Sequence, residues 1–503
     1  MAKNLEWFQH NFSNISVDVD RVKYLEELQI ALSTSRKQDL TAIVANLQLG
    51  VVFDCLNTTD KSQIELTIAV LKKLLPVLDP CDVIKLYGVH LGRALEHPEI
   101  EAKKLVISEL NRAAKNHSVL ALICNETPLL LSVIDCVKAE DLSLATVAAN
   151  FLEELGKILD GIRVLFHPVL LDVLKKSSEE SDIVRFRIYE IIVKISIASI
   201  QGLEASANSG LLINLLNELQ SGDILLQLTS LETVTKLALC DHGLRFLKEK
   251  GLLNYAQEQL ANSESTNNLL LTGFIKFFGN VAQTKPEEVF LEYPSVLNLV
   301  FNLCDSNDPI LSNIALETVG FIASNPEGKK ALNQRHSEMQ NVMKIIERTI
   351  ATQPTERKVV ALNVLSNILQ LDVSVQTPEL LLLTKNYYLQ ISQNPMKTLK
   401  TICEKPFTEL KLAGLTTLSK IVVQPWGLEE VKKCSGLIEY FLDRNEESDM
   451  NCKTIKYNLV QIIAEHPLAR SIFGSDIISK FQLHVKQGIC YVQSKTEVMF
   501  EAT

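Results

Sequence analysis

The chain contains 503 residues, of which 47% are hydrophobic and 6% aromatic, and it carries a formal net charge of −10 at pH 7. This acidic balance, without any dense Lys/Arg cluster, argues against a nucleic-acid partner, because binding to phosphates depends on basic patches. The longest apolar runs, such as Leu129–Ile134, are too short to cross a bilayer, so no membrane partner is expected.

Two further features bear on the compartment. The N-terminal stretch MAKNLEWFQHNFSN lacks the apolar segment of a secretory signal. The ten cysteines are scattered, and no two have CxxC spacing. Most lie on apolar helical faces, where a reduced thiol packs as a small hydrophobic side chain. These observations predict a cytoplasmic protein, with the nucleus as a second location.

Residues 1–57 are predicted to form N-terminal cap helices. A polar leader precedes an amphipathic segment at Val19–Leu32, and the apolar stretch LGVVFDCL follows at Leu49–Leu56. The end units of a repeat array are usually atypical because one of their faces meets water.

Residues 58–370 are predicted to contain the main series of helical repeats, and the clearest repeat begins at Asp182. Its first helix has one apolar face formed by Val184, Ile188, Ile191, Ile192 and Ile195, and a second formed by Phe186, Tyr189 and Val193. A helix that is apolar on two sides must lie between neighbouring helices. A Gly-bearing turn and a Leu-rich helix complete the unit.

The same order of parts recurs along the chain. It begins again at Asp223 and Asp308, and weaker copies begin near Asp60, Glu99, Asp141, Asn267, Glu356, Glu409 and Asp449. Successive starts are mostly about 40 residues apart, the period of HEAT or armadillo repeats. One such unit cannot bury its own apolar face, whereas stacked units can. The predicted fold is therefore all-α: a HEAT/armadillo-like α-solenoid that forms a curved superhelix of roughly ten to eleven repeats.

The spacing lengthens at residues 371–408, which contain Pro378, Pro395 and Pro406. Because proline cannot continue a helix, this segment is predicted to be irregular, with a long loop or an extra helix. Regular repeats are expected again at 409–487, and residues 488–503 are predicted to be a polar tail.

Catalytic, cofactor and metal sites have no recognisable pattern in this sequence. It contains no GxxxxGK[ST], HExxH or GxSxG motif. The nine histidines are isolated, whereas a metal site needs three or four converging ligands. The sequence therefore predicts that the chain is not an enzyme and binds no cofactor or metal. An unrecognised enzyme remains one alternative.

One polar pattern recurs in register near the ends of the long helices. A polar residue follows another polar residue four positions earlier, and such residues share a helix face. The pairs are Glu153/Lys157, Glu190/Lys194, Glu232/Lys236, Lys276/Asn280 and Asn363/Asn367. In an armadillo-type superhelix these positions line the concave groove, so we predict that they bind a partner, and we call them the polar ladder.

A simpler interpretation of the polar ladder is a series of pairs within each helix on a solvated face, each contributing about 0.2–0.5 kcal/mol. For any single pair this interpretation is at least as good as partner binding. The recurrence of the pairs in register along the chain favours partner binding. The repeat at Asp308 interrupts the ladder, because Glu317 is followed by Phe321.

Several stretches are more specific than the repeat pattern. They are LGVVFDCL at Leu49–Leu56, DIVRFRIYEIIVKIS at Asp182–Ser196, FIKFFGNVA at Phe274–Ala282, EYP at Glu292–Pro294, QPW at Gln424–Trp426 and GLIEYFLDR at Gly436–Arg444. In this order, from about residue 20 to the end, they resemble a family of HEAT/armadillo-like chaperones that assemble the base of the 26S proteasome's 19S regulatory particle.

The resemblance implies a function and a set of partners. Members of that family use a C-shaped solenoid to hold the C-terminal domain of a proteasome ATPase, regulatory subunit 7. They travel with a second ATPase, regulatory subunit 4, and with non-ATPase subunit 2, and they leave before the 26S particle is complete. The family contributes no catalytic residues, and its contact residues cannot be placed on this chain by motif.

Two other binding functions stay open from the sequence. A nuclear-import adaptor would carry a Trp and an Asn on nearly every inner helix, but the only tryptophans are Trp7 and Trp426. A generic HEAT/armadillo scaffold, for a phosphatase or a trafficking coat, is compatible with the composition.

Overall fold

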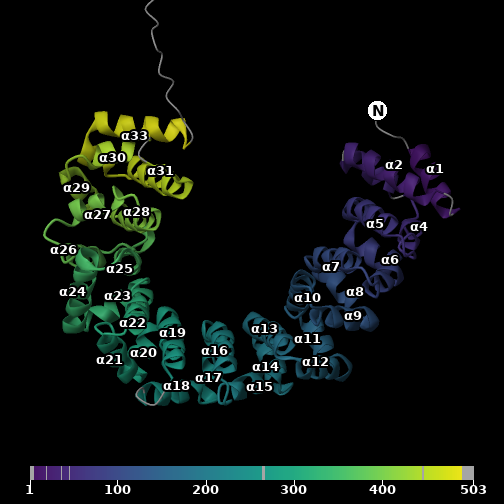
Figure 1. The fold of residues 1–503 in the computed structure, drawn as a ribbon, viewed down its shortest axis with the longest axis horizontal. Coiled ribbons are helices and arrows are strands. Elements are labelled where there is room, and N and C mark those ends of the chain that lie inside the picture. Colours follow the sequence, from purple (N-terminus) through teal and green to yellow (C-terminus); the bar gives the residue numbers. More distant parts are fainter. Residues whose placement is uncertain are drawn as a thin grey trace, which may run out of the picture. The chain divides into compact units, whose positions relative to one another are not determined.

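The computed structural model describes residues 5–17, 20–35, 37–44, 46–262, 267–444 and 447–489. Within these ranges the regular structure is entirely helical (Figure 1). The chain divides into two compact units, residues 1–246 and 247–503. Each unit is a stack of helical repeats, so the predicted all-α solenoid is confirmed.

Long helices form one layer of unit 1, and each packs against the next: α2 (Arg21–Thr34), α5 (Lys61–Leu74), α7 (Ile100–Ala114), α10 (Leu142–Leu155), α13 (Asp182–Ala198) and α16 (Ile224–Ala238). We call this the long-helix layer. A second layer contains α1 (Leu5–Ser16), α4 (Gly50–Asp54), α6 (Pro80–Leu95), α9 (Thr127–Val137), α12 (Pro168–Glu180) and α15 (Leu211–Glu218). Short helices connect the layers: α3 (Lys37–Val44), η1 (Leu75–Val77), α8 (His117–Ile123), α11 (Leu159–Leu165) and α14 (Ile200–Asn208).

Unit 2 repeats this arrangement. Its long-helix layer contains α19 (Asn268–Thr284), α22 (Pro309–Ile322), α25 (Thr355–Leu369), α28 (Thr408–Val422) and α31 (Met450–Glu465). Its second layer contains α18 (Leu252–Ala261), α21 (Pro294–Leu303), α24 (His336–Thr352), α27 (Pro395–Cys403), α30 (Leu437–Leu442) and α33 (Ser475–Gln487). The connectors are α20 (Pro286–Glu292), α23 (Pro326–Asn333), η2 (Val373–Val375), α26 (Pro378–Leu389), α29 (Pro425–Lys433) and α32 (Ala469–Phe473), while α17 (Asp241–Glu249) spans the boundary between the units.

The segment 371–408, which was predicted to be irregular, contains α26 and α27. The first packs against α23 and α25, as a connector does, and the second packs against α28, as a second-layer helix does. Pro378 and Pro395 each stand at the start of a helix, where the missing N–H of proline costs nothing. Of the predicted tail at 488–503, residues 490–503 lie outside the described residues.

Acidic and amide side chains begin many of the long helices. The side chains of Asp60, Asp141, Asp223, Asn267, Asp308 and Asp449 each accept a hydrogen bond from a backbone N–H in the first turn. Each of these residues marks a repeat start predicted from the sequence. At the repeat that begins near Asp182 the capping residue is instead Ser181. Such caps satisfy N–H groups that a helix cannot pair internally.

The apolar faces predicted for α13 are buried. Ile188, Ile192 and Val193 are each exposed by 1% or less, although they point to different sides of the helix. α13 packs against α10, α12, α14 and α16, which explains why one helix needs two apolar strips.

The glycines of the connectors let two chain segments approach closely. A Cβ at Gly161 of α11 would lie 1.9 Å from the carbonyl oxygen of Leu155 at the end of α10, and one at Gly328 of α23 would lie 1.8 Å from that of Ile322. The same approach recurs at Gly202, Gly243 and Gly427. Only glycine fits where a connector crosses the end of the preceding long helix.

Cationic side chains join neighbouring repeats by capping carbonyl groups. Arg187 of α13 donates to the carbonyl oxygens of Val137 (2.9 Å) and Ala139 (2.7 Å), just beyond α9. Arg112 of α7 donates to those of Leu75 and Leu78, each at 3.0 Å. A cation at a helix C-terminus satisfies carbonyls that have no partner in the helix and opposes the negative end of the helix dipole.

Candidate partner-binding surface

The polar ladder of unit 1 pairs charges between repeats. Lys194 Nζ of α13 lies 2.6 Å from Glu153 Oε1 of α10. One repeat further along, Lys236 Nζ of α16 lies 2.9 Å from Glu190 Oε1 of α13. Each lysine therefore reaches back to the glutamate of the preceding long helix.

This pairing differs from the pairs within helices that the sequence suggested. Lys157 pairs with Glu154, three positions earlier and at 2.5 Å, and not with Glu153. Glu190 contacts Lys236 of the next repeat and not Lys194 of its own helix. Because α10, α13 and α16 pack side by side, a lysine side chain can span the distance between neighbouring helix surfaces.

The ladder of unit 1 is accessible from solvent. The side chains of Lys194, Glu190 and Lys236 are 46%, 47% and 41% exposed. Glu153 is the most covered member, and burial raises the pKa of its carboxyl even though Lys194 opposes this effect. Half-exposed pairs of this kind contribute at most about 1 kcal/mol to stability, so the charges remain available to a partner.

The predicted ladder residues of unit 2 form no such series. Asn280 of α19 donates its side-chain amide to the carbonyl of Lys276 at 2.9 Å, and the side chains of Lys276 and Asn363 are exposed. The backbone carbonyl of Asn367 accepts a hydrogen bond from Lys329. α22, which carries the partly exposed Phe321, lies between α19 and α25. The structure thus places cross-repeat ion pairs on α10, α13 and α16 and separate polar side chains on α19 and α25.

A second recurring feature of the long-helix layer escaped the sequence analysis. Large apolar side chains stand exposed at the starts of its helices: Ile100, Leu142, Ile183 and Leu225 in unit 1, and Leu269, Ile310, Phe407 and Met450 in unit 2. We call them the apolar edge of each unit. A side chain at the start of a helix projects beyond the neighbouring layer, so the core does not cover it. For seven of these eight side chains the available signal was an apolar residue one or two positions after the capping residue, whereas Phe407 is itself the N-cap residue of α28.

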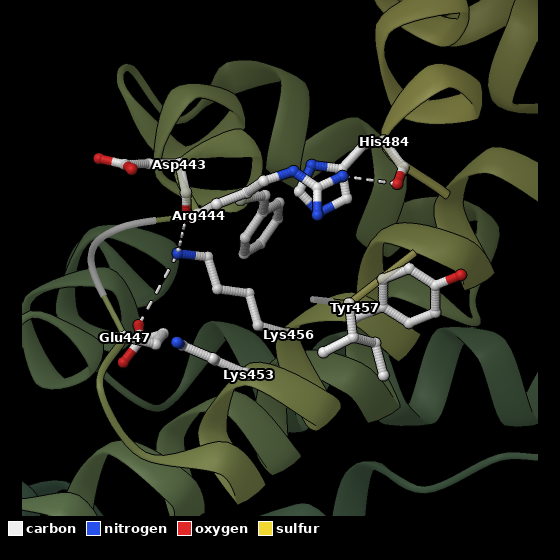
Figure 2. A pocket seen from close by; sticks show the side chains of 9 residues that line it. Asp443, Arg444, Glu447, Lys453, Lys456, Tyr457 and His484 are labelled. Carbon is white, nitrogen blue, oxygen red and sulfur yellow. Dashed lines mark hydrogen bonds and ion pairs between the residues drawn. The ribbon is translucent and has the colours of Figure 1, made fainter. Parts of the chain in front are cut away.

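A buried polar cluster in unit 2 has a structural explanation. Glu447 accepts a hydrogen bond from Tyr440 Oη at 2.7 Å and pairs with Lys411 Nζ at 2.7 Å. Figure 2 shows its further contact with Lys456, whose Nζ lies 3.8 Å from Glu447 Oε1. Lys456 Nζ donates to the carbonyl of Asp443 at 2.8 Å and lies 4.1 Å from the centre of the Tyr440 ring. The cavity beside them measures about 30 Å³, far below the roughly 300–1,000 Å³ of pockets that bind small ligands. These contacts tie Asp443 and Glu447 to α28, α30 and α31.

The same cluster closes the end of α33. Arg444 donates to the carbonyl oxygens of His484 (2.7 Å) and Gly488 (2.6 Å). His484 is only 8% exposed, and burial, Arg444 and Lys456 together lower the pKa of its imidazole to about 4. A neutral imidazole is thereby held beside two cations (Figure 2).

Comparison with known proteins identifies the family. A family model described as "Proteasome non-ATPase 26S subunit" matches residues 4–503. The chain belongs to this family. It is 32% identical over 475 residues to the "26S proteasome non-ATPase regulatory subunit 5" of Homo sapiens, covering 93% of this chain and 94% of that one. It is 33% identical over 472 residues to the protein of the same name from Bos taurus, with the same coverage.

A solved structure is similar to part of the chain. A designed armadillo repeat protein matches 50% of this chain and 98% of its own length, with a TM-score of 0.36 and 13% sequence identity.

The described part of this proteasome-subunit family member contains neither a metal-binding cluster nor an activated buried thiol among the groups below. Within the described ranges, no three His, Cys, Asp or Glu side chains are placed to hold a metal ion. Burial raises the pKa of the Cys304 thiol to about 12 and also raises that of Cys403. Protonated buried thiols of this kind are poor nucleophiles. Cys490 lies outside the described residues.

Among the described residues no single helix is long and apolar enough to span a membrane. Only α8 and α9 taken together reach that length and hydrophobicity, and they are bent by 94° relative to each other.

Proposed function

We propose that this chain is an assembly chaperone for the base of the 19S regulatory particle of the 26S proteasome. It binds the C-terminal domain of an ATPase, regulatory subunit 7, within a module that also contains regulatory subunit 4 and non-ATPase subunit 2. It leaves before the 26S particle is complete, and it acts in the cytoplasm, with the nucleus as a second site. The observation that carries the proposal is the 32–33% identity to proteins named 26S proteasome non-ATPase regulatory subunit 5 over 93% of this chain.

Two features of the long-helix layer support a binding function. The polar ladder offers half-exposed charges of both signs at regular intervals on α10, α13 and α16. The apolar edge adds one exposed apolar side chain at the start of most of these helices. A surface that combines spaced charges with apolar side chains suits a folded protein domain, because the charges set orientation and the apolar groups supply burial.

The proposed mechanism is steric. A bound chaperone covers the surface through which the ATPase tail would dock on the 20S core, and docking waits until a competing surface displaces it. No catalytic group is required, because binding energy alone determines which complex forms.

The import-adaptor alternative finds little support in the structure. Trp426 is 6% exposed and donates its indole N–H to Gln424 at 3.0 Å, so it is part of the core. A tryptophan engaged in this way does not line a peptide-binding surface.

The test is affinity capture of the tagged full-length chain from cell lysate, followed by identification of its partners. We expect regulatory subunits 7 and 4 and non-ATPase subunit 2, without subunits of the 20S core. Recovery of the 20S core in equal amounts would contradict release before completion. Recovery of import cargo or phosphatase subunits in place of proteasome ATPases would reject the proposed function.

A further inference from the structure

A pocket of about 440 Å³ lies between α24 and α27 in unit 2. Its apolar wall contains Ile350, Ile391 and Ile402, which are at most 5% exposed. Pockets that bind small ligands or peptide side chains measure about 300–1,000 Å³, so this pocket is large enough, unlike the cavity of Figure 2.

Three lysines from different places in the fold line this pocket. Lys358 belongs to α25, Lys397 to the first turn of α27, and Lys405 follows the end of α27. The only carboxylate in the lining is that of Glu347. Across the described part of the chain, none of the three lysines forms an ion pair. Burial, together with the nearby charge of Lys405, lowers the pKa of Lys358.

The pocket on the other side of α27 provides a comparison. It has a similar volume, about 470 Å³, and it shares Lys397, but its other two lysines are paired with carboxylates. There, Lys433 Nζ lies 2.7 Å from Glu430 Oε1, and Lys400 Nζ lies 3.4 Å from Glu404 Oε1. The pocket between α24 and α27 therefore differs in that none of its lysines has an ion-pair partner among the described residues, in a chain whose net charge is −10.

The start of α27 adds to this positive potential. Asn394 is the N-cap residue but makes no capping hydrogen bond with its side chain, and it lines the pocket together with Ser392 and Thr398. The N-terminus of a helix carries a partial positive charge that favours an anion. The hydroxyl groups of Ser392 and Thr398 bond to each other at 2.8 Å, so the lysines and the helix start are the groups that give this cavity its positive potential.

We propose that this pocket binds an acidic peptide segment of a partner protein. One or two carboxylates of the segment lie among Lys358, Lys397 and Lys405, and an adjacent apolar side chain enters the cavity above Ile350, Ile391 and Ile402. A free phosphate would satisfy the lysines but leave most of the cavity, about 440 Å³, unfilled. A peptide that carries both kinds of group covers both parts of the pocket. This site goes beyond the function proposed above, since unit 2 alone forms it and it includes no residue of the polar ladder.

The experiment measures peptide binding to the full-length chain by fluorescence anisotropy. The probe is fluorescein-labelled Gly-Glu-Leu-Glu-Leu-Gly, with matched peptides in which Gln or Lys replaces Glu. We expect the acidic peptide to bind about tenfold more tightly than the Gln peptide at low salt, and to lose this advantage as salt screens the charges. Equal binding of the three peptides would overturn the proposal.

Paired variants locate the site. The double variant Lys358→Gln/Lys405→Gln, which changes two lysines that line only this pocket, is expected to weaken binding of the acidic peptide about tenfold, whereas Lys433→Gln, in the other pocket, leaves it unchanged. Circular dichroism and thermal unfolding establish that both variants are folded. Unchanged binding in the double variant would reject this pocket. Displacement of the peptide by inorganic phosphate at lower concentration than by unlabelled peptide would indicate a phosphate site and also overturn the proposal. Capture of proteasome ATPases is a separate measurement, so failure here is distinguishable from failure of the proposed function.

Discussion

Lys329 Nζ, on the connector α23, lies 2.9 Å from the carbonyl oxygen of Ile368 at the end of the long helix α25. The same ammonium donates to the carbonyl of Asn367 at 2.9 Å and to that of Ala323, just after α22. The residue is only 1% exposed. Burial lowers the pKa of Lys329 to about 7, while three carbonyl acceptors favour its charged form. One side chain therefore caps the C-termini of two successive long helices.

Replacing Lys329 with methionine should destabilise unit 2. The variant keeps a similar side-chain volume but leaves buried carbonyl groups without a donor, at an expected cost of about 3 kcal/mol. Because repeat arrays open locally, hydrogen exchange at the ends of α22 and α25 is the appropriate measurement. We expect faster exchange at both ends.

The neighbouring Lys330 provides the control for this prediction. Its side chain is 42% exposed and pairs only with Glu327. Lys330→Met should change exchange little, because exposed ion pairs contribute at most about 1 kcal/mol. Equal effects of the two substitutions would contradict the capping function of Lys329.

Substitution by alanine should change stability in opposite directions at two glycines. A Cβ at Gly156, the C-cap residue of α10, would lie 2.3 Å from Ile195 Cγ1 of α13, so Gly156→Ala should force α10 and α13 apart and cost about 1–3 kcal/mol. A Cβ at Gly88, inside α6, would meet nothing within 4 Å. Gly88→Ala should therefore stabilise the helix by up to about 1 kcal/mol. Urea unfolding followed by circular dichroism measures both, and destabilisation by Gly88→Ala would contradict the packing described for α6.

The sequence predicted those parts of the fold that depend on local pattern. The apolar strips of α13 followed from helical periodicity, and Asp141 and Asp223 identified helix starts because a capping residue acts on its own first turn. These features need no knowledge of which segment lies alongside.

Contacts between repeats were harder to foresee. Lys194 and Glu153 are 41 residues apart, and Lys329 and Asn367 are 38 apart, so no helical period relates them. A local rule pairs Glu153 with Lys157, whereas in the structure Glu153 pairs with Lys194 of the next long helix and Lys157 pairs with Glu154. A search for opposite charges separated by about one repeat length would have found the first of these contacts.

Glu232 offers a direct test of the polar ladder. It lies on α16 with an exposed side chain and makes no ion pair within the described ranges, so Glu232→Lys should change stability by no more than about 0.5 kcal/mol. If the ladder contacts the C-terminal domain of regulatory subunit 7, the same change should weaken binding about tenfold. Isothermal titration calorimetry with the purified domain measures this effect.

A matched substitution controls for net charge in that experiment. Glu204 lies on the connector α14, away from the ladder, and its side chain is also exposed. Glu204→Lys should leave affinity unchanged. Identical affinities for the two variants would show that the ladder is only a solvated surface.

His484 should make the stability of unit 2 depend on pH. Its pKa is lowered to about 4 in the folded chain from an ordinary value of 6.5, because the imidazole is buried beside Arg444 and Lys456. Between these two values the unfolded chain binds a proton that the folded chain does not. The stability that the neutral imidazole of His484 allows is therefore fully present above about pH 6.5. It is lost as the pH falls towards 4, and the free energy of unfolding decreases by at most about 1.4 kcal/mol per pH unit.

Substitution of His484 by phenylalanine separates the effect of this imidazole on stability from that of the carboxylates, whose protonation also changes stability at acidic pH. Phenylalanine fills the buried site without a titrating group, so His484→Phe should lose less stability than the parent chain between about pH 7 and about pH 5. Urea midpoints at the two pH values measure the difference. The exposed His117 of α8 provides the control, since His117→Phe should retain the parent's pH dependence. If His484→Phe lost as much stability in acid as the parent, the imidazole would have to be protonated in the folded chain, and its burial beside two cations would not control its charge.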